Sequence, residues 1–240
     1  MVSYNECMSP AFICALLLSL GSQKLHIKSA DLRLRGVVGD SYSYVMTMTI
    51  KAVKEKGQKS WTMYYDQTLK KVDGKNFYWN TTFSLGKAKA FGVMQGDHDD
   101  LSKIDGAEMT FVQNERGENV QAKMLGQTLP GRTGANVTLP GKRVKIGDTW
   151  TSKTNIKGSP PTITYKLRGF AHVFGKDVAF IEGTFPNTMY AEQLGASRFM
   201  VDMKTGVMIA GDGHVATWDH GRLVTVEYTI EPGYDIYSEF

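Results

Sequence analysis

Alternation of apolar and polar residues dominates the chain from residue 42 onward. Every second residue from Tyr42 to Ala52 is apolar or aromatic, and Ser, Thr and Lys occupy most of the positions between them. A period of two residues is typical of a strand with one buried face. The same alternation recurs at residues 60–69, 162–167 and 222–231. Residues 75–83 and 177–185 are rich in aromatic, β-branched and Thr side chains, which also favour strands.

Turn residues separate these stretches at short intervals. Asp73-Gly74, Gly57 in the polar stretch 54–59, and Lys204-Thr205-Gly206 each favour a tight connection between antiparallel strands. Helical patterns are confined to short pieces, of which residues 188–199 (TMYAEQLGASRF) are the longest. The sequence therefore predicts an all-β fold with minor helix, built from antiparallel curved sheets.

Three landmarks occur twice in the same order. The tetrads Gly39-Asp40-Ser41-Tyr42 and Gly147-Asp148-Thr149-Trp150 are each followed by Val-x-Gly-Lys and then by a hairpin with a Gly tip. We interpret this order as an internal duplication. The predicted organisation is a first β-rich half at 24–128, a connection at 129–136 and a second β-rich half at 137–240.

The aspartates of the two tetrads allow two interpretations. Asp40 and Asp148 could meet at a pseudo-twofold site as the acid and base of a hydrolase. Alternatively, each carboxylate accepts hydrogen bonds from its own turn, and the aromatic residue that follows begins a buried face. We favour the second interpretation because a strand begins immediately after each tetrad.

The N-terminal segment has the features of a signal peptide, which we predict to span residues 1–23. An apolar run from Ala11 to Leu20 ends beside small residues, although a buried helix or an uncleaved anchor would also fit it. Both cysteines, Cys7 and Cys14, lie in this segment, so the mature chain would have no disulfide and no thiolate metal site. We expect a secreted or periplasmic protein of the cell envelope with no membrane span in the mature chain.

Charge and motif content exclude several function classes. The net charge is +4, and the basic residues form no stripe with interleaved aromatics, so we expect no nucleic-acid partner. The acidic stretch 96–101 (GDHDDL) lacks the glycine and the third ligand of a calcium loop, and no zinc ligands accompany His98. No Gly-x-Ser-x-Gly elbow or phosphate-binding loop occurs. The sequence predicts no cofactor, no metal and no enzyme.

The stretch from Leu139 to Trp150 (LPGKRVKIGDTW) and the strands after it resemble secreted bacterial β proteins grouped as domain of unknown function 6263. The resemblance covers the second half mainly and implies a secreted or envelope-associated β protein without an established activity; it supplies no catalytic residues. It rests on Pro140, Lys142, Val144, Gly147, Asp148, Thr149 and Trp150, then Tyr165 and Leu167, then Gly175, Lys176, Val178 and Ala179, and finally Asp202, Thr205 and Gly206.

Aromatic and Met side chains gather on one face of the first two long strands. Such a face could hold an acyl chain or a hydrophobic peptide, or it could simply fill the core. The function we predict is a non-enzymatic binding module for a lipid or other apolar ligand, with a carboxylate-based hydrolase and a structural module that binds an envelope protein as alternatives. The predicted ligand-binding residues are Tyr42, Tyr44, Met46, Met48, Trp61, Met63 and Tyr65.

Overall fold

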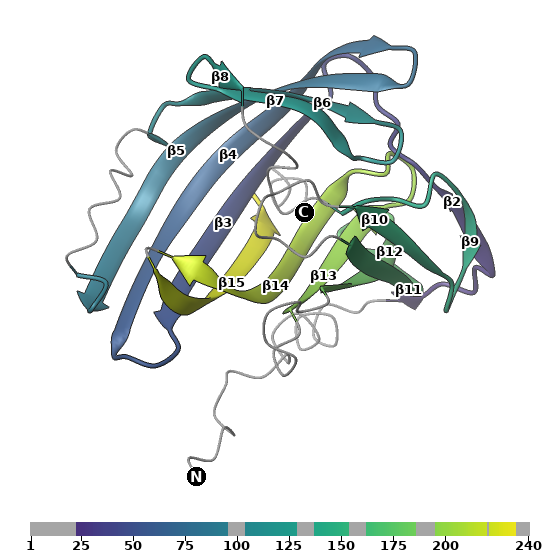
Figure 1. Ribbon diagram of the computed structural model, residues 1–240. Helices are drawn as coiled ribbons and strands as arrows, with labels where there is room; N and C mark the ends of the chain where they lie inside the picture. The colour runs from purple at the N-terminus through teal and green to yellow at the C-terminus, as the bar shows by residue number, and fades with distance from the viewer. Residues whose placement is uncertain are drawn as a thin grey trace.

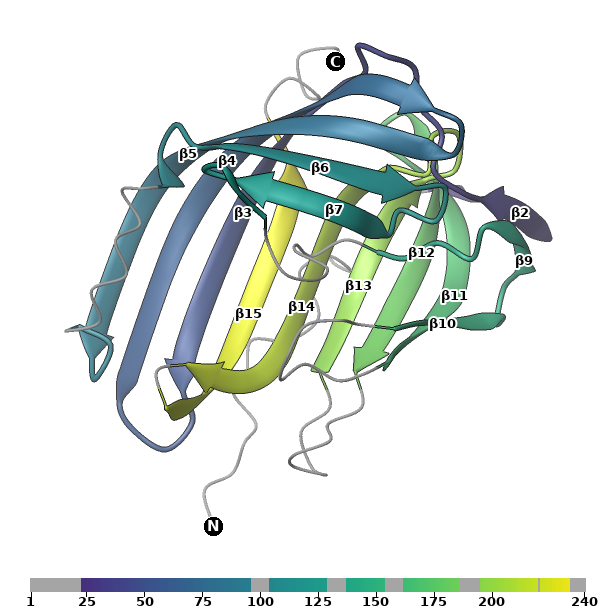
Figure 2. The same cartoon turned by 45° about the horizontal axis from the view of Figure 1, so that its top comes forward.

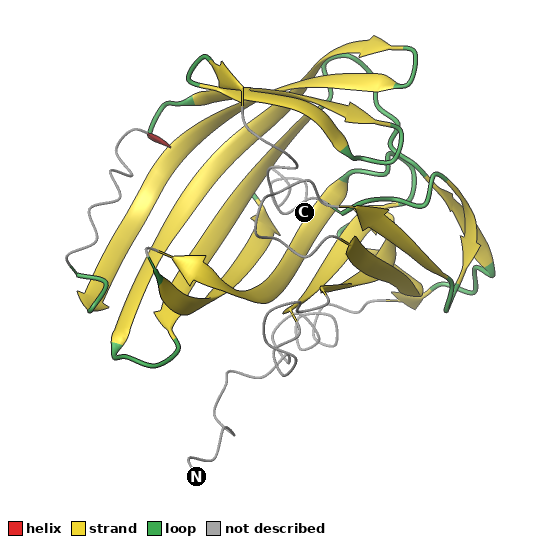
Figure 3. Ribbon diagram, viewed as in Figure 1, coloured by secondary structure: helices red, strands yellow, loops and turns green. Residues whose placement is uncertain are grey.

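A computed structural model of the chain describes residues 23–95, 104–128, 137–153, 162–185, 195–219 and 221–233. Strands make up 72% and helix 1% of the structure, and every strand pairing in the described part is antiparallel, which confirms the predicted fold class (Figure 3). The strands are β1 (Gln23–Lys24), β2 (Ser29–Leu32), β3 (Ser41–Ala52), β4 (Gly57–Asp73), β5 (Asn76–Gly92), β6 (Glu108–Asn114), β7 (Asn119–Met124), β8 (Gln127–Thr128), β9 (Lys142–Lys145), β10 (Thr149–Lys153), β11 (Thr162–Val173), β12 (Lys176–Phe185), β13 (Gly195–Asp202), β14 (Met208–Asp219) and β15 (Arg222–Pro232).

One curved sheet of thirteen strands makes up most of the molecule (Figure 1). Its order is β1-β11-β12-β13-β14-β15-β3-β4-β5-β6-β7-β8, and β10 also pairs with β11. The last of the described strands, β15, lies beside β3 and so joins the two predicted halves in a single sheet. β2 and β9 form a separate two-stranded ribbon.

Length and bulges give the sheet its curvature. β4 and β5 have 17 residues each, about 55 Å at roughly 3.3 Å per residue. The register between them shifts twice, at Trp61/Met63 and at Leu69/Lys71, and a further shift separates Leu167 from Gly169 between β11 and β12. A bulge bends its strand and increases the local twist, so the strands wrap around a concave side.

The two Gly-Asp turns have the same hydrogen bonds. Gly39 and Gly147 both have positive φ, and their N–H groups donate to the carbonyl oxygens of Leu69 and Leu167 over 2.9 Å in each case. The equivalence of the two turns supports the predicted duplication, which stays a prediction together with its boundaries.

The predicted turns at Gly74 and residues 204–206 are confirmed as strand connections. The connection predicted at 54–59 lies at 53–56, and Gly57 already begins β4, where it pairs with Gly92 of β5. The short helix expected at 188–199 is wrong for residues 195–199, which belong to β13, because β12 and β14 supply backbone partners on both sides. The rest of that stretch, the acidic stretch 96–101, the connection 129–136 and the predicted signal peptide up to residue 22 lie outside the described residues.

The main hydrophobic core covers the concave side of the sheet. Leu32, Leu34 and Leu139 lie in or near the β2–β9 ribbon and pack into it with no more than 4% of their surface exposed. Trp150 stacks on Tyr165 with 5.8 Å between ring centroids, and its Nε1 donates to the Thr138 carbonyl over 2.6 Å. In the described part of the chain, no helix is long and apolar enough to cross a membrane.

Candidate ligand-binding cavity

A cavity of about 120 Å³ lies where the sheet folds back on itself. Figure 2 shows β6 and β7 passing over the concave side in front of β14 and β15. Side chains of β6 therefore face side chains of β3, β14 and β15 across the cavity. The lining residues are Leu34, Tyr44, Met46, Tyr65, Gln67, Thr81, Phe83, Met109, Phe111, Gln113, Gly117, Asn119, Val137, Gly206, Val207, Met208 and Ile230.

Backbone hydrogen bonds from the segment after β2 hold the two layers together. The N–H of Leu34 donates to the Glu115 carbonyl over 2.7 Å, at the tip of the β6–β7 hairpin. The N–H of Arg35 donates to the Thr205 carbonyl over 2.6 Å, at the tip of the β13–β14 hairpin. One short segment, which we call the clamp (residues 32–36), thus bridges both hairpins, and its residue Leu34 lines the cavity.

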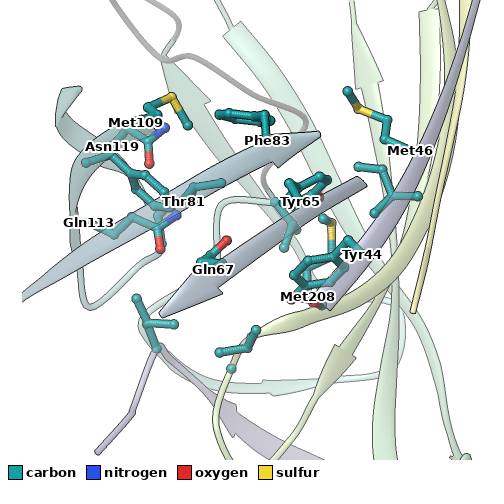
Figure 4. Close-up of a pocket in the computed structure, with 17 residues that line it drawn as sticks. Tyr44, Met46, Tyr65, Gln67, Thr81, Phe83, Met109, Gln113, Asn119 and Met208 are labelled. Carbon is teal, nitrogen blue, oxygen red and sulfur yellow. Dashed lines mark hydrogen bonds between the residues drawn. The ribbon is translucent and has the colours of Figure 1, made fainter. Parts of the chain in front are cut away.

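Aromatic rings and thioethers form the apolar side of the cavity. Tyr44, Tyr65 and Phe83 are cross-strand partners on β3, β4 and β5. The rings of Tyr44 and Tyr65 stack with centroids 4.9 Å apart, and the ring of Phe83 tilts against Tyr65 at 5.9 Å. Tyr44 donates its hydroxyl hydrogen to the Met208 carbonyl over 2.7 Å, which fixes the ring between the layers. Met46 completes this side (Figure 4).

The other side carries uncharged polar side chains beside Met109 and Phe111. Gln67 and Thr81 are cross-strand partners, as are Gln113 and Asn119. Gln113 donates from Nε2 to the Gly117 carbonyl over 3.1 Å. Thr81 is 1% exposed, and its Oγ1 has no hydrogen-bond partner in the described part of the chain. An unpaired buried hydroxyl costs about 1–3 kcal/mol, so the fold retains this group at a loss of stability.

The described wall of the cavity carries no charge. Among the residues that the structure describes, no Asp, Glu, Lys, Arg or His lines it. Burial raises the pKa of Tyr44 well above its ordinary value and also raises the pKa of Tyr65, so both phenols keep their protons at physiological pH. The described side chains of the cavity can act through apolar contact and uncharged hydrogen bonds.

All seven residues predicted to bind a ligand share one face of β3 and β4, as the strand register shows. Tyr44, Met46 and Tyr65 line the cavity. Tyr42 tilts against Trp79 beside it, and Trp61 packs in a separate cluster with Ile50, Met94 and Val224. Met63 pairs with Met46 beside the cavity, and Met48 pairs with Trp61 farther along the same face. Whether any of the seven contacts a ligand stays a prediction.

Sequence reasoning missed the side of the cavity contributed by β5, β6 and the β13–β15 region. Met109, Phe111 and Gln113 alternate along β6, a signal visible in the sequence, but nothing local shows that this strand folds back over β3. Met208 and Ile230 reach the cavity from strands far away in the sequence.

The tetrad aspartates stay with their own turns. Asp40 Oδ2 accepts from the Val37 N–H over 2.8 Å, and Asp148 Oδ2 accepts from the Lys145 N–H over 2.9 Å. Strands β11 to β15 separate β10 from β3 in the sheet, and neither aspartate lines the cavity. In the described residues, no group of three His, Cys, Asp or Glu side chains could hold a metal ion.

A second hollow, of about 300 Å³, lies on the outer face of β11 to β14. Phe180, Met200 and Ala210 contribute apolar surface to it. Its charged residues pair with each other across strands, Arg168 with Glu182 and Arg198 with Asp212. Because this hollow is bounded by a single layer, it offers less enclosure to an apolar ligand than the cavity between the layers.

No family model matches the chain, and no curated protein sequence matches it. Three solved structures are similar over most of its length. A lipovitellin structure concerned with lipid–protein interactions is 7% identical with a TM-score of 0.41 and covers 82% of this chain, which spans only 25% of the lipovitellin chain. A domain described as an outer membrane lipoprotein-sorting protein, from Vibrio parahaemolyticus, is 12% identical with a TM-score of 0.27, and 83% of this chain and 85% of that chain are covered. A protein of the family DUF1329 from Desulfovibrio piger is 12% identical with a TM-score of 0.26, over 82% and 85% of the two chains. All three TM-scores are low, so we draw neither a function nor a ligand from these similarities.

Proposed function

We propose that the protein is a non-enzymatic binding module that holds an apolar ligand on the concave face of its sheet. The observation that carries this proposal is the cavity between the two layers, with Tyr44, Met46 and Tyr65 on one wall and Met109 and Phe111 on the other. Polarizable thioethers and flat rings adapt to apolar ligands of irregular shape.

The size of the cavity limits what enters it. At about 120 Å³ it is smaller than the roughly 300 Å³ at which sites for whole drug-sized ligands begin. We infer that one part of the ligand occupies the cavity and that the remainder follows the concave face toward Met63, Met48 and Trp61, which continue the same row of side chains.

The location we propose is the cell envelope or the extracellular space. It rests on the signal peptide predicted at residues 1–23, and a bacterial source rests on the resemblance to domain of unknown function 6263. Both stay predictions.

Two alternative functions have less support. A hydrolase would need Asp40 and Asp148 in one cleft, whereas each carboxylate binds its own turn. A structural interaction module would use an open edge, and residues 88–92 of β5 pair with β4 alone in the described part of the chain. Lys89 lies on this edge, Lys87 lies directly before it, and both are exposed. Lysines on an edge strand oppose the addition of another strand.

Titration with the neutral fluorescent probe N-phenyl-1-naphthylamine tests the proposal. We expect saturable binding to the wild type and at least about tenfold weaker binding to Met46→Glu, because a carboxylate in the cavity must lose its hydration. Thr47→Glu is the matched control, since Thr47 is exposed on the opposite face of β3. No saturable binding, or equal affinities for the two variants at equal folded fractions, would contradict the proposal.

A further inference from the structure

The polar side of the cavity is built from four uncharged side chains on adjacent strands. Gln67 on β4 pairs with Thr81 on β5, and Gln113 on β6 pairs with Asn119 on β7. In Figure 4 the four side chains gather on one side, and Tyr44, Met46 and Met208 lie on the other. An amide or hydroxyl beside an apolar cavity fixes the orientation of a bound ligand and adds to its affinity.

Thr81 provides the observation that points to a ligand. Its side chain lines the cavity and is 1% exposed, and Oγ1 has no hydrogen-bond partner in the described part of the chain. Two residues earlier on the same face of β5, Trp79 Nε1 is also buried and lacks a partner within the described residues. Buried polar groups in native proteins are nearly always paired, so the Thr81 hydroxyl at the cavity wall is available to a polar group that enters the cavity.

The absence of charge at the cavity wall restricts the chemistry of that partner. Within the described ranges, no Lys, Arg or His lines the cavity to pair with a carboxylate or a phosphate, and no Asp or Glu lines it to pair with an amine. A charged headgroup would therefore lose its hydration without compensation. An uncharged donor or acceptor would find both kinds of partner, because side-chain amides and hydroxyls donate and accept.

We propose that this polar wall binds an uncharged hydrogen-bonding group, such as a hydroxyl or an ester or amide carbonyl, carried by an otherwise apolar ligand. The preferred ligands are neutral lipids, and lipids whose charged headgroup must enter the cavity are excluded. This inference rests on the proposed function, since it names the ligand class of the same cavity.

Displacement of N-phenyl-1-naphthylamine by three twelve-carbon compounds tests the inference: 1-dodecanol, dodecane and dodecanoate. We expect the wild type to bind 1-dodecanol roughly three- to tenfold more tightly than dodecane, the worth of about one net hydrogen bond. Dodecanoate should bind more weakly than 1-dodecanol.

Variants at two neighbouring threonines test whether Thr81 causes the preference for 1-dodecanol over dodecane. In Thr81→Val the ratio of 1-dodecanol affinity to dodecane affinity should fall toward one, while the stability of the fold is kept because Val has the same shape and removes an unpaired hydroxyl. In Thr82→Val the ratio should stay as in the wild type, since Thr82 is exposed on the opposite face of β5.

The possible failures are distinguishable. If the wild type does not bind the fluorescent probe, the proposed function fails and the inference fails with it. If the probe binds but Thr81→Val keeps the wild-type ratio, or dodecanoate competes as well as 1-dodecanol, the proposed function stands and the inference is overturned.

Discussion

At the scale of single residues, the tetrad Gly147-Asp148-Thr149-Trp150 begins in a turn and ends in the hydrophobic core. Asp148 stands in an exposed turn and accepts one backbone hydrogen bond there. Trp150, two residues later, is buried against Tyr165. The alternation of the sequence predicts this division, because a period of two residues places the aromatic residue on the inner face without knowledge of the fold.

We expect Trp150→Ala to lower the free energy of unfolding by about 3–5 kcal/mol, the cost of a cavity left by a large buried side chain. Asp148→Asn should cost less than about 1 kcal/mol, because the amide oxygen can still accept the hydrogen bond from the Lys145 N–H. Urea denaturation of both variants measures the two costs. Similar costs for the two substitutions would contradict the division of roles.

At the scale of elements, the clamp depends on a close backbone approach. Gly206 has φ of 71°, and a Cβ atom there would lie 2.1 Å from the Arg33 carbonyl oxygen. Gly74, at the β4–β5 turn, has φ of 59° and nothing within 4 Å of the equivalent position. Both glycines therefore have a positive φ, but only at Gly206 would a Cβ atom collide with the neighbouring backbone.

Gly206→Ala should destabilise the fold by more than Gly74→Ala and should also weaken binding of N-phenyl-1-naphthylamine, because the clamp must move away from the β13–β14 hairpin. Gly74→Ala should cost only the strain of a left-handed alanine, about 1–2 kcal/mol, with unchanged probe affinity. Urea denaturation and probe titration measure both effects. Equal destabilisation by the two variants would show that the clamp is not under steric constraint.

Hairpins were the most predictable elements, since Asp73-Gly74 and Lys204-Thr205-Gly206 mark their turns locally. The β2–β9 ribbon was not predictable, because it pairs Ser29 with Lys145, which lie far apart in the sequence. The folding of β6 and β7 over the concave side depends on bulges and on the clamp. Neither leaves a periodic signal, which is why the sequence predicted one wall of the cavity and missed the other.

At the scale of the whole molecule, buried tyrosines link stability to alkaline pH. Burial raises the pKa of Tyr42 to about 12 and also raises the pKa of Tyr44, Tyr65 and Tyr228. In the unfolded chain these phenols titrate near pH 10. Above that pH the unfolded state releases protons that the folded state retains, so the free energy of unfolding falls as pH rises.

We expect these groups to contribute no pH dependence below about pH 9, and we expect stability to fall between about pH 10 and pH 12 by up to roughly 1.4 kcal/mol per pH unit for each tyrosine. Tyr65→Phe should make the decline shallower, whereas Phe83→Leu, beside it in the cavity, keeps all four phenols and the wild-type slope. Urea denaturation at a series of pH values gives the slopes. An unchanged slope in Tyr65→Phe would contradict the assignment.

The central claim is that an apolar ligand occupies the cavity between the layers, and the methionines report on it directly. Met46, Met109 and Met208 line the cavity, whereas Met200 lines the hollow on the outer face. The decisive measurement is the methyl NMR spectrum of protein labelled with ¹³C-methyl methionine, recorded during titration with N-phenyl-1-naphthylamine. We predict saturable shifts of the Met46, Met109 and Met208 methyl signals while the Met200 signal stays in place. Shifts confined to Met200, or bound probe without shifts at the three cavity methionines, would contradict the account.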